Sequence, residues 1–549
     1  MTTIADPTST QTLADAFLST VEARGDAPAL LDADLTVALS WRGYGEQARR
    51  AAAGLRALGL RRGDTLGLLL SNRPEFHVAD VAALLAGATP FSMYNTSSPE
   101  QLAHLVTDAG CRIAVTEAEL LPRLLAAREI TGGLLEHVIV VDEGDDGLLR
   151  WPELLTGGDE LTVDIAAGAA EDLATIIYTS GTTGPPKGVQ LTHANVLAMV
   201  GDVRGLLGVA PEGRAISYLP MAHIAERTAT HYLHMTVGFG VVCCRRPGDV
   251  ADLLPRVRPD FFFSPPRLWE KLRAGVLARV SAEQLAESEQ ACVDTRWALG
   301  FDRLQAAITG AAPCPPAVIE FFHSIGVPLR EVYGLSETTG LISFSRADDI
   351  RVGTVGPPVP SMEVRLGDDG EVLARGALVM GGYRNMPEQT AEMIDADGWL
   401  HTGDVGALDG DGHLRIVDRK KELIINASGK NMSPANIEAR LKEASPLIDQ
   451  ACVIGDARPY NVALIVLDGE AAAALGEVSE EDRRAEVQRA VDAANAKLAR
   501  VEQIKRFALL TEEWLPDSDE LTPTMKLKRK PIAQKYAEQI EELYAEGRS

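Results

Sequence analysis

Residues 178–188 read Tyr-Thr-Ser-Gly-Thr-Thr-Gly-Pro-Pro-Lys-Gly. The run before them, 173–177, is apolar and partly β-branched, which predicts a buried strand. The segment after them, 189–197, contains Thr192, a residue type that caps helices. We therefore expect a loop of small hydroxyl and glycine residues, carrying the single cation Lys187, between a strand and a helix.

The composition of this loop suits a polyphosphate ligand. Unhindered backbone N–H groups, hydroxyl donors and a mobile cation are the groups that bind phosphates. Two alternatives are a plain turn and a Walker-type loop, which needs Gly-x-x-x-x-Gly-Lys and then Ser or Thr. Here Gly184 precedes Pro185, Pro186 and Lys187, so the Walker spacing fails.

Length and charge restrict the class of protein. A chain of 549 residues is too long for one core, so we expect two to four domains. The net charge of −25 argues against nucleic acid or anionic lipid as a main partner, so an ATP site would need a local cluster of cations or N–H groups.

The N-terminal residues and the cysteines predict a location. Residues 1–6 have no basic region and no apolar core, so they are not a signal peptide, and the longest apolar runs are too short to span a bilayer. The six cysteines show no Cys-x-x-Cys spacing, which is typical of buried thiols in a reducing compartment. We expect a cytoplasmic protein with at most transient membrane contact.

The remaining patterns predict an α/β protein. Residues 10–165 alternate helical and strand patterns, with a helix over 44–58, a buried strand over 64–70 and a helix from Pro74 to near Gly87, which predicts a largely parallel sheet. Residues 350–415 contain short strands, such as 363–366 and 371–374, and predict an antiparallel or barrel-like unit. In the smaller α/β piece that follows, we expect strands over 451–454 and 464–466 and helices over 481–498 and 534–544.

Four further stretches follow in order. They are 333–340 (Tyr-Gly-Leu-Ser-Glu-Thr-Thr-Gly), 398–404 (Gly-Trp-Leu-His-Thr-Gly-Asp), 416–421 (Ile-Val-Asp-Arg-Lys-Lys) and 521–530 (Leu-Thr-Pro-Thr-Met-Lys-Leu-Lys-Arg-Lys). Each alone has an ordinary alternative: a strand end with a turn, a Gly-Asp turn, a solvated charge run or a basic tail. Together with 178–188, and in this order, they resemble the motifs of the adenylate-forming superfamily. That superfamily comprises acyl-CoA synthetases, peptide-synthetase adenylation domains and beetle luciferases.

The resemblance implies a two-part architecture. Residues 1–420 would form an N-terminal adenylation domain, made of two α/β subdomains and a small β-barrel-like subdomain, which binds ATP and the acyl group. A hinge at Lys421 would join it to a small, mobile α+β domain, 421–549, that carries the catalytic lysine. The Pro-Thr-x-x-Lys context points to Lys526, with Lys528 as the alternative because Met525 stands where many relatives have glycine.

The resemblance also implies roles for single residues. Tyr333 would pack on the adenine, Ser336 would reach the α-phosphate, Glu337 would hold Mg²⁺, and Asp404 and Arg419 would contact the ribose. The implied nucleotide- and cofactor-binding residues are Thr179, Ser180, Gly181, Thr182, Thr183, Gly184, Gly310, Ala311, Tyr333, Gly334, Ser336, Asp404, Arg419, Lys421 and Gly429. The implied metal ligands are Glu337 and Thr182, and the implied catalytic residues are Lys526, Glu337, Lys187 and His223.

Two stretches bear on the substrate. Residues 218–227, which contain His223, resemble the long-chain fatty acyl-CoA synthetase version of a superfamily motif, although a single histidine is more often merely packed. Residues 299–313 resemble the bubblegum branch for long and very long chains. We therefore expect an ATP-dependent long-chain fatty acid–CoA ligase that uses ATP, Mg²⁺ and CoA.

Other functions stay open at this point. They are a fatty acyl-AMP ligase, a CoA ligase for a medium-chain or aryl acid, and a non-catalytic nucleotide-binding protein, which would be expected to lack Glu337, Asp404 or Lys526. A homodimer is one oligomeric state that the sequence permits.

Overall fold

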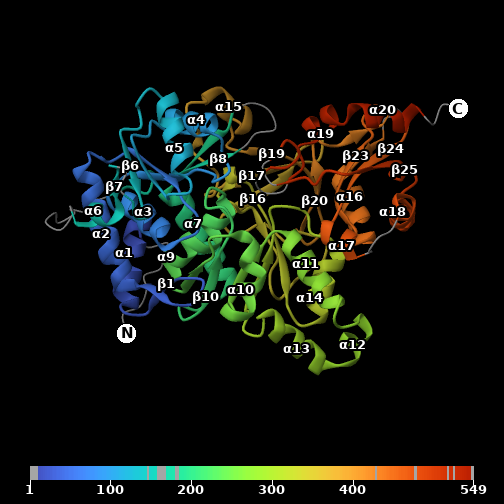
Figure 1. Ribbon diagram of the computed structural model, residues 1–549, viewed down its shortest axis with the longest axis horizontal. Coiled ribbons are helices and arrows are strands. Elements are labelled where there is room, and N and C mark those ends of the chain that lie inside the picture. Colours follow the sequence, from blue (N-terminus) through green and yellow to red (C-terminus); the bar gives the residue numbers. More distant parts are fainter. Residues whose placement is uncertain are drawn as a thin grey trace.

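The computed structural model describes residues 10–144, 147–156, 168–179, 185–426, 430–474, 479–515, 518–522 and 526–545. Figure 1 shows a large N-terminal part, built of several sheets and their helices, beside a smaller C-terminal part. The antiparallel sheet that contains β16, β17, β19 and β20 lies between them (Figure 1). This mixed α/β architecture confirms the fold class predicted from the sequence.

The largest sheet has the strand order β18-β9-β8-β4-β3-β5-β6-β7. Its strands are β3 (Thr65–Leu69), β4 (Thr89–Ser92), β5 (Ile113–Thr116), β6 (His137–Val140), β7 (Leu149–Arg150), β8 (Leu173–Thr179), β9 (Lys187–Thr192) and β18 (Gly382–Tyr383). The helices of this part are α1 (Leu13–Arg24), α2 (Trp41–Ala57), α3 (Pro74–Leu85), α4 (Pro99–Ala109), α5 (Leu121–Ile130) and α6 (Trp151–Thr156). Strand β3 pairs in parallel with β4 and β5 and is buried along its whole length, as its uninterrupted apolar run predicts.

The segment after the 178–188 loop differs from the prediction. Residues Lys187–Thr192 form strand β9, antiparallel to β8, so the loop closes a β-hairpin instead of opening a helix. The reason is the alternation of Val189 and Leu191, both buried, with the half-buried Gln190, which is the period of a strand. Helix α7 (His193–Leu207) begins only after it, and Thr192 caps it as expected.

Two further four-stranded sheets complete the α/β region. One has the order β10-β11-β1-β2, with β1 (Pro28–Leu31), β2 (Val37–Ser40), β10 (Arg214–Ser217) and β11 (Gly240–Cys243). The other has the order β12-β13-β14-β15, with β12 (Phe261–Ser264), β13 (Ala306–Thr309), β14 (Leu329–Tyr333) and β15 (Ser343–Phe344). Their helical elements are α8 (Ile224–Glu226), the π-helix η2 (Arg227–Tyr232), α9 (Leu233–Val237), η3 (Pro247–Asp249), α10 (Val250–Val257), α11 (Pro266–Leu277), α12 (Ala282–Glu287), α13 (Glu289–Leu299), α14 (Pro316–Ser324) and η4 (Ser336–Thr338).

The antiparallel unit predicted for 350–415 is a sheet of order β16-β17-β19-β20. Its strands are β16 (Met362–Leu366), β17 (Glu371–Gly376), β19 (Leu400–Leu408) and β20 (Leu414–Arg419), and α15 (Pro387–Met393) precedes β19. Every pairing within it is antiparallel, as the short runs and turns predict. Strands β19 and β20 carry Asp404 and Arg419 opposite each other in register.

The C-terminal part has a three-stranded sheet of order β23-β24-β25. Its elements are β21 (Ile424–Ile425), β22 (Asn431–Met432), α16 (Pro434–Ala444), β23 (Ile448–Ile454), β24 (Asn461–Leu467), α17 (Gly469–Ala474), α18 (Glu480–Asn495), β25 (Ile504–Leu510), α19 (Arg529–Lys535) and α20 (Ala537–Ala545). The strands over 451–454 and 464–466 and the helix over 481–498 are confirmed. The helix expected over 534–544 is two helices that meet near Tyr536. All six cysteines are buried and unbridged, as expected.

Candidate active site

A tyrosine and an arginine hold the carboxylate of Asp404. The Tyr333 hydroxyl donates to Asp404 Oδ2 at 2.6 Å, and Arg419 Nε lies 2.9 Å from Asp404 Oδ1. Asp404 is buried, and this burial raises the pKa of its carboxyl although Arg419 opposes the shift. Each carboxylate oxygen thus contacts one donor, and a carboxylate with two acceptor oxygens suits a vicinal diol.

A second group joins Lys187, Tyr383 and Glu337. The Tyr383 hydroxyl donates to Glu337 Oε1 at 2.8 Å, and Lys187 Nζ lies 4.8 Å from the centre of the Tyr383 ring. Lys187 is the first residue of β9 and stands opposite Thr179 at the end of β8, so these two residues frame the loop between the strands.

Lys526 connects the two groups from the C-terminal part. Crowding by the protein and the charge of Arg419 lower the pKa of the Lys526 ammonium, while Asp404, Glu337 and Glu422 act on it in the opposite direction. Its side chain still reaches solvent. Its backbone is held by Thr522, because the Thr522 N–H donates to the Lys526 carbonyl at 2.8 Å and the Lys526 N–H to Thr522 Oγ1 at 3.0 Å.

Lys528 points elsewhere. Its Nζ donates to the backbone carbonyl of Ser518 at 2.8 Å, and its N–H donates to the Glu520 carbonyl at 2.7 Å. Both partners belong to the C-terminal part, so the geometry favours Lys526 over Lys528 as the lysine of the site.

His223 lies at the same site as an uncharged side chain. Its Nδ1 accepts from the Ala225 N–H at 3.1 Å at the start of α8, which fixes the ring. Burial and then the charge of Lys526 lower its pKa to about 3, so the imidazole is neutral at physiological pH. Because the His223 ring carries no charge, one negative charge on a ligand balances the positive charge of Lys526.

Close backbone contacts explain two of the predicted glycines. A Cβ on Gly310 would lie 2.8 Å from the Val332 carbonyl oxygen, and one on Gly334 would lie 2.4 Å from the Gly340 backbone. Ala311 has φ of +66°, the left-handed region. Ser336 and Glu337 lie on η4, directly after β14, which ends in Tyr333. The predicted residues Ser180, Gly181, Thr182, Thr183, Gly184 and Gly429 lie outside the described residues.

Two sequence families match the chain. Residues 17–386 match the family described as AMP-binding enzyme, and residues 421–548 match the AMP-binding enzyme C-terminal domain. This chain belongs to the AMP-binding enzyme family.

Curated relatives of this AMP-binding enzyme are fatty-acid–CoA ligases by name. The long-chain-fatty-acid–CoA ligase FadD15 of Mycobacterium bovis is 36% identical over 559 residues, which cover 91% of this chain and 91% of that protein. The long-chain-fatty-acid–CoA ligase ACSBG2 of Xenopus laevis is 31% identical and covers 98% of this chain and 84% of that protein.

A solved structure supports the fold of this AMP-binding enzyme. The adenylation domain of a carboxylate reductase from Mycobacterium chelonae has a TM-score of 0.85 at 22% identity and covers 98% of this chain and 92% of that one. Among the described residues, no helix is both long and apolar enough to cross a membrane.

The residues at the site of this AMP-binding enzyme suit a nucleotide that carries Mg²⁺. Within the described ranges, no group of three or more His, Cys, Asp or Glu side chains could hold a metal. Glu337 supplies a carboxylate at the site, and Tyr383 contacts one of its oxygens, Oε1. Mg²⁺ commonly takes one or two protein carboxylates and completes its shell with water and phosphate oxygens, so a single carboxylate beside Lys187 and Lys526 suits it.

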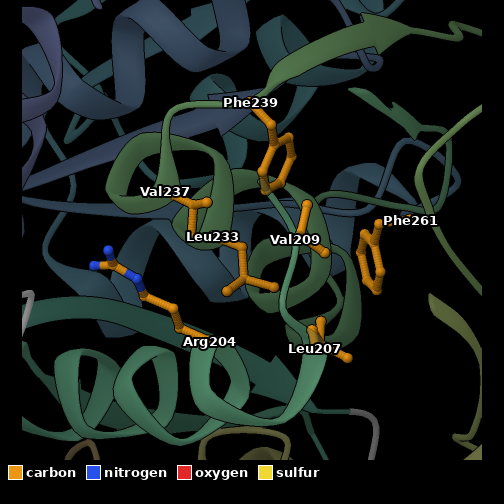
Figure 2. A pocket seen from close by; sticks show the side chains of 7 residues that line it. All are labelled: Arg204, Leu207, Val209, Leu233, Val237, Phe239 and Phe261. Carbon is orange, nitrogen blue, oxygen red and sulfur yellow. The ribbon is translucent and has the colours of Figure 1, made fainter. Parts of the chain in front are cut away.

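A small apolar pocket lies in the N-terminal part. Figure 2 shows Leu207, Val209, Leu233, Val237, Phe239 and Phe261 around it, with Arg204 at its edge. Its walls come from α7, α9 and β12, and α9 follows α8 and η2 without a break. Its volume is about 10 Å³, which is room for no more than about one water molecule, so it does not accommodate a hydrocarbon chain.

Two features of the site were missed from the sequence. Tyr383 is the aromatic group between Lys187 and Glu337, and no motif pointed to it. Lys420 and Glu422 flank the predicted hinge: Lys420 Nζ lies 3.2 Å from Glu371 Oε2 in β17, and Glu422 Oε2 lies 3.1 Å from Arg529 Nε in α19. In the sequence, these two residues are marked only by their opposite charges within a stretch of positively and negatively charged residues.

Proposed function

We propose that this enzyme joins a long-chain fatty acid to CoA in two steps, through an acyl-adenylate, with release of pyrophosphate and then AMP. The observation that carries the proposal is Lys526, which the C-terminal part brings to Glu337, Asp404 and His223 in the N-terminal part. The names of the curated relatives support the choice of acid and acceptor.

In the first step a fatty carboxylate attacks the α-phosphorus of ATP. Negative charge builds on the phosphoryl oxygens, so positioning and electrostatics dominate catalysis. Lys526 neutralises charge at the α-phosphate, Lys187 binds the β- and γ-phosphates, and neutral His223 lies beside the carboxylate. A Mg²⁺ ion bound with the nucleotide would neutralise further phosphate charge, and Glu337 and Thr182 would be its protein ligands.

The group formed by Asp404, Tyr333 and Arg419 recognises the nucleoside. Asp404 accepts from both ribose hydroxyls, Arg419 contacts the ribose, and Tyr333 packs on the adenine. Tyr333 and Arg419 each contact one oxygen of Asp404, and these contacts orient the carboxylate.

In the second step the CoA thiol attacks the acyl carbonyl and expels AMP. The C-terminal domain, 421–549, rotates about Lys421, which withdraws Lys526 and brings the Gly429 region toward the thiol. Two observations support the hinge. Its neighbours Lys420 and Glu422 are anchored to opposite sides, whereas the Lys421 side chain is exposed.

Rotation must also break ion pairs that hold the present arrangement. Arg267 in α11 contacts Asp449, and it lies 3.3 Å from Asp468 Oδ2, both in the C-terminal part. Partly exposed pairs of this kind contribute about 1 kcal/mol or less each, so they bias the arrangement without locking it.

The substitution Lys421→Pro tests the hinge. Proline fixes φ near −65°, so we expect thioester formation from supplied acyl-AMP to fall on the order of tenfold, while acyl-AMP formation changes little. The control is Lys421→Ala, which removes the same side chain and keeps backbone freedom. A proline variant that completes both steps as fast as the alanine variant removes the hinge from the mechanism.

The pKa of Lys526 predicts the alkaline limit of the first step. Lys526 acts as a cation, and its lowered pKa means that it loses its proton as pH rises through a value below the ordinary lysine range. The rate of acyl-AMP formation should therefore be full below that pKa and fall above it. In Lys526→Arg the guanidinium stays charged, so the alkaline fall should vanish; an unchanged fall would assign it to another group.

Substrate assays test the proposed function as a whole. Pyrophosphate and AMP release should be measured against fatty acids from short to very long chain, medium-chain acids and aryl acids, each with and without CoA. We expect long-chain acids to give the highest kcat/KM and CoA to be required for turnover. Turnover on aryl acids alone, or adenylate formation without CoA transfer, would support one of the alternative ligases.

We also propose a cytoplasmic location. The substrates are small molecules, and a fatty acid drawn from a bilayer would require only transient contact with it.

A further inference from the structure

We infer that Tyr383 is a positioning residue that holds Glu337 and Lys187 apart in their working places. This inference rests on the proposed function for its mechanistic meaning. Its hydroxyl donates to Glu337 Oε1 at 2.8 Å, while Lys187 Nζ lies 4.8 Å from the centre of its ring. One buried side chain therefore contacts both the carboxylate and the cation.

The backbone fixes the Tyr383 ring. Strand β18 pairs antiparallel with β9, so Tyr383 stands opposite Val189, two residues from Lys187. The Tyr383 N–H donates to Thr390 Oγ1 at 2.9 Å. The Met380 N–H donates to the Glu337 backbone carbonyl at 2.9 Å, so the same segment holds the main chain of Glu337 as well.

Charge explains why a tyrosine is needed there. Lys187 and Glu337 have opposite charges and would pair if nothing separated them. Such a pair would take the cation from the phosphates and the carboxylate from the metal. Within the described residues the two side chains form no ion pair. The π face of Tyr383 contacts the ammonium, and its hydroxyl occupies Glu337 Oε1.

The hydroxyl is a permanent donor. A phenol ordinarily keeps its proton at physiological pH, and this one donates it to Glu337 Oε1 at 2.8 Å. The hydrogen bond directs Glu337 through Oε1 and holds its carboxylate in one orientation. Phenylalanine at this position would keep the ring for Lys187 and remove the donor, whereas leucine would remove both contacts.

Binding of Mn²⁺ as a probe for Mg²⁺ tests the inference without turnover. Mn²⁺ is titrated into the protein with a non-hydrolysable ATP analogue, and free Mn²⁺ is measured by electron paramagnetic resonance. In Tyr383→Phe we expect Mn²⁺ to bind about tenfold more weakly, as for a lost hydrogen bond to a charged group. In Tyr383→Leu the nucleotide analogue should also bind more weakly, because Lys187 is released.

Tyr44→Phe is the matched control. Tyr44 is also buried, and its hydroxyl donates to the His77 backbone carbonyl at 2.9 Å, away from Glu337 and Lys187. It should leave Mn²⁺ and nucleotide binding at wild-type values. If Tyr383→Phe binds Mn²⁺ as tightly as Tyr44→Phe does, Tyr383 does not position Glu337. Because this readout needs no acid substrate, it fails or succeeds independently of the assays for fatty-acid activation.

Discussion

Lys526→Ala is expected to lower acyl-AMP formation by about a hundredfold or more, the effect of losing one preorganised charge at the transition state. The reason is the position of Lys526, whose charge interacts with Glu337, Asp404 and His223 of the N-terminal part. Thioester formation from supplied acyl-AMP should keep its wild-type rate, because the lysine leaves the site in that step. Stopped assays of the two half-reactions measure the difference.

Lys528→Ala is the matched control, two residues along the same basic stretch. Its ammonium contacts the Ser518 carbonyl inside the C-terminal part, so we expect both half-reactions to stay near wild type. Equal losses in both half-reactions for Lys526→Ala would give that residue a structural role. If Lys528→Ala lost more acyl-AMP formation than Lys526→Ala, Lys528 would be the catalytic lysine instead of Lys526.

Arg227→Met is expected to lower the free energy of unfolding of the N-terminal part by about 3–5 kcal/mol. Arg227 and Asp80 are both fully buried and form an ion pair, and Arg227 also donates to Ser92 Oγ at 2.7 Å and to the Tyr232 hydroxyl at 2.9 Å. Without the guanidinium, the one partner among the described residues that the Asp80 carboxylate keeps is His231, whose Nε2 lies 2.9 Å from Asp80 Oδ1. Urea unfolding followed by circular dichroism measures the loss.

A double substitution separates the lost pair from lost packing. Arg227→Met with Asp80→Leu removes the stranded carboxylate, so it should recover part of the stability. Because Arg227 begins η2, directly after the α8 segment that His223 caps, the pair also anchors the segment that carries His223. A single Arg227→Met variant as stable as wild type would show that the pair contributes nothing to this anchoring.

Patterns that repeat along one element could be predicted from the sequence. The strand over 64–70 is buried on both faces, so its apolar run admits few alternatives. Strand β9 was missed because it is short and ends at Thr192, whose capping signal belongs to the helix after it. A local cap indicates where a helix begins and carries no information about the residues before it.

The residues of the candidate site are likewise of two kinds: those that lie in sequence motifs and those that only the fold brings together. Asp404, Glu337 and Lys526 lie in motifs with a fixed order, so a resemblance could assign them before any contact was known. Tyr383 is separated from Glu337 by 46 residues and from Lys187 by far more. The register of β18 on β9 brings Tyr383 near Lys187, and the Met380 N–H bond to the Glu337 carbonyl brings the same segment to Glu337. The residue pattern within one segment does not indicate that β18 pairs with β9.

The central claim is that the enzyme activates an acid as a mixed anhydride with AMP. The most direct measurement follows the carboxylate oxygens of a long-chain fatty acid labelled with ¹⁸O during turnover with ATP and CoA. Attack of the carboxylate on the α-phosphorus leaves one labelled oxygen in AMP after the thiol displaces it, so mass spectrometry should find AMP with a single ¹⁸O. Unlabelled AMP, or label in inorganic phosphate, would contradict the account.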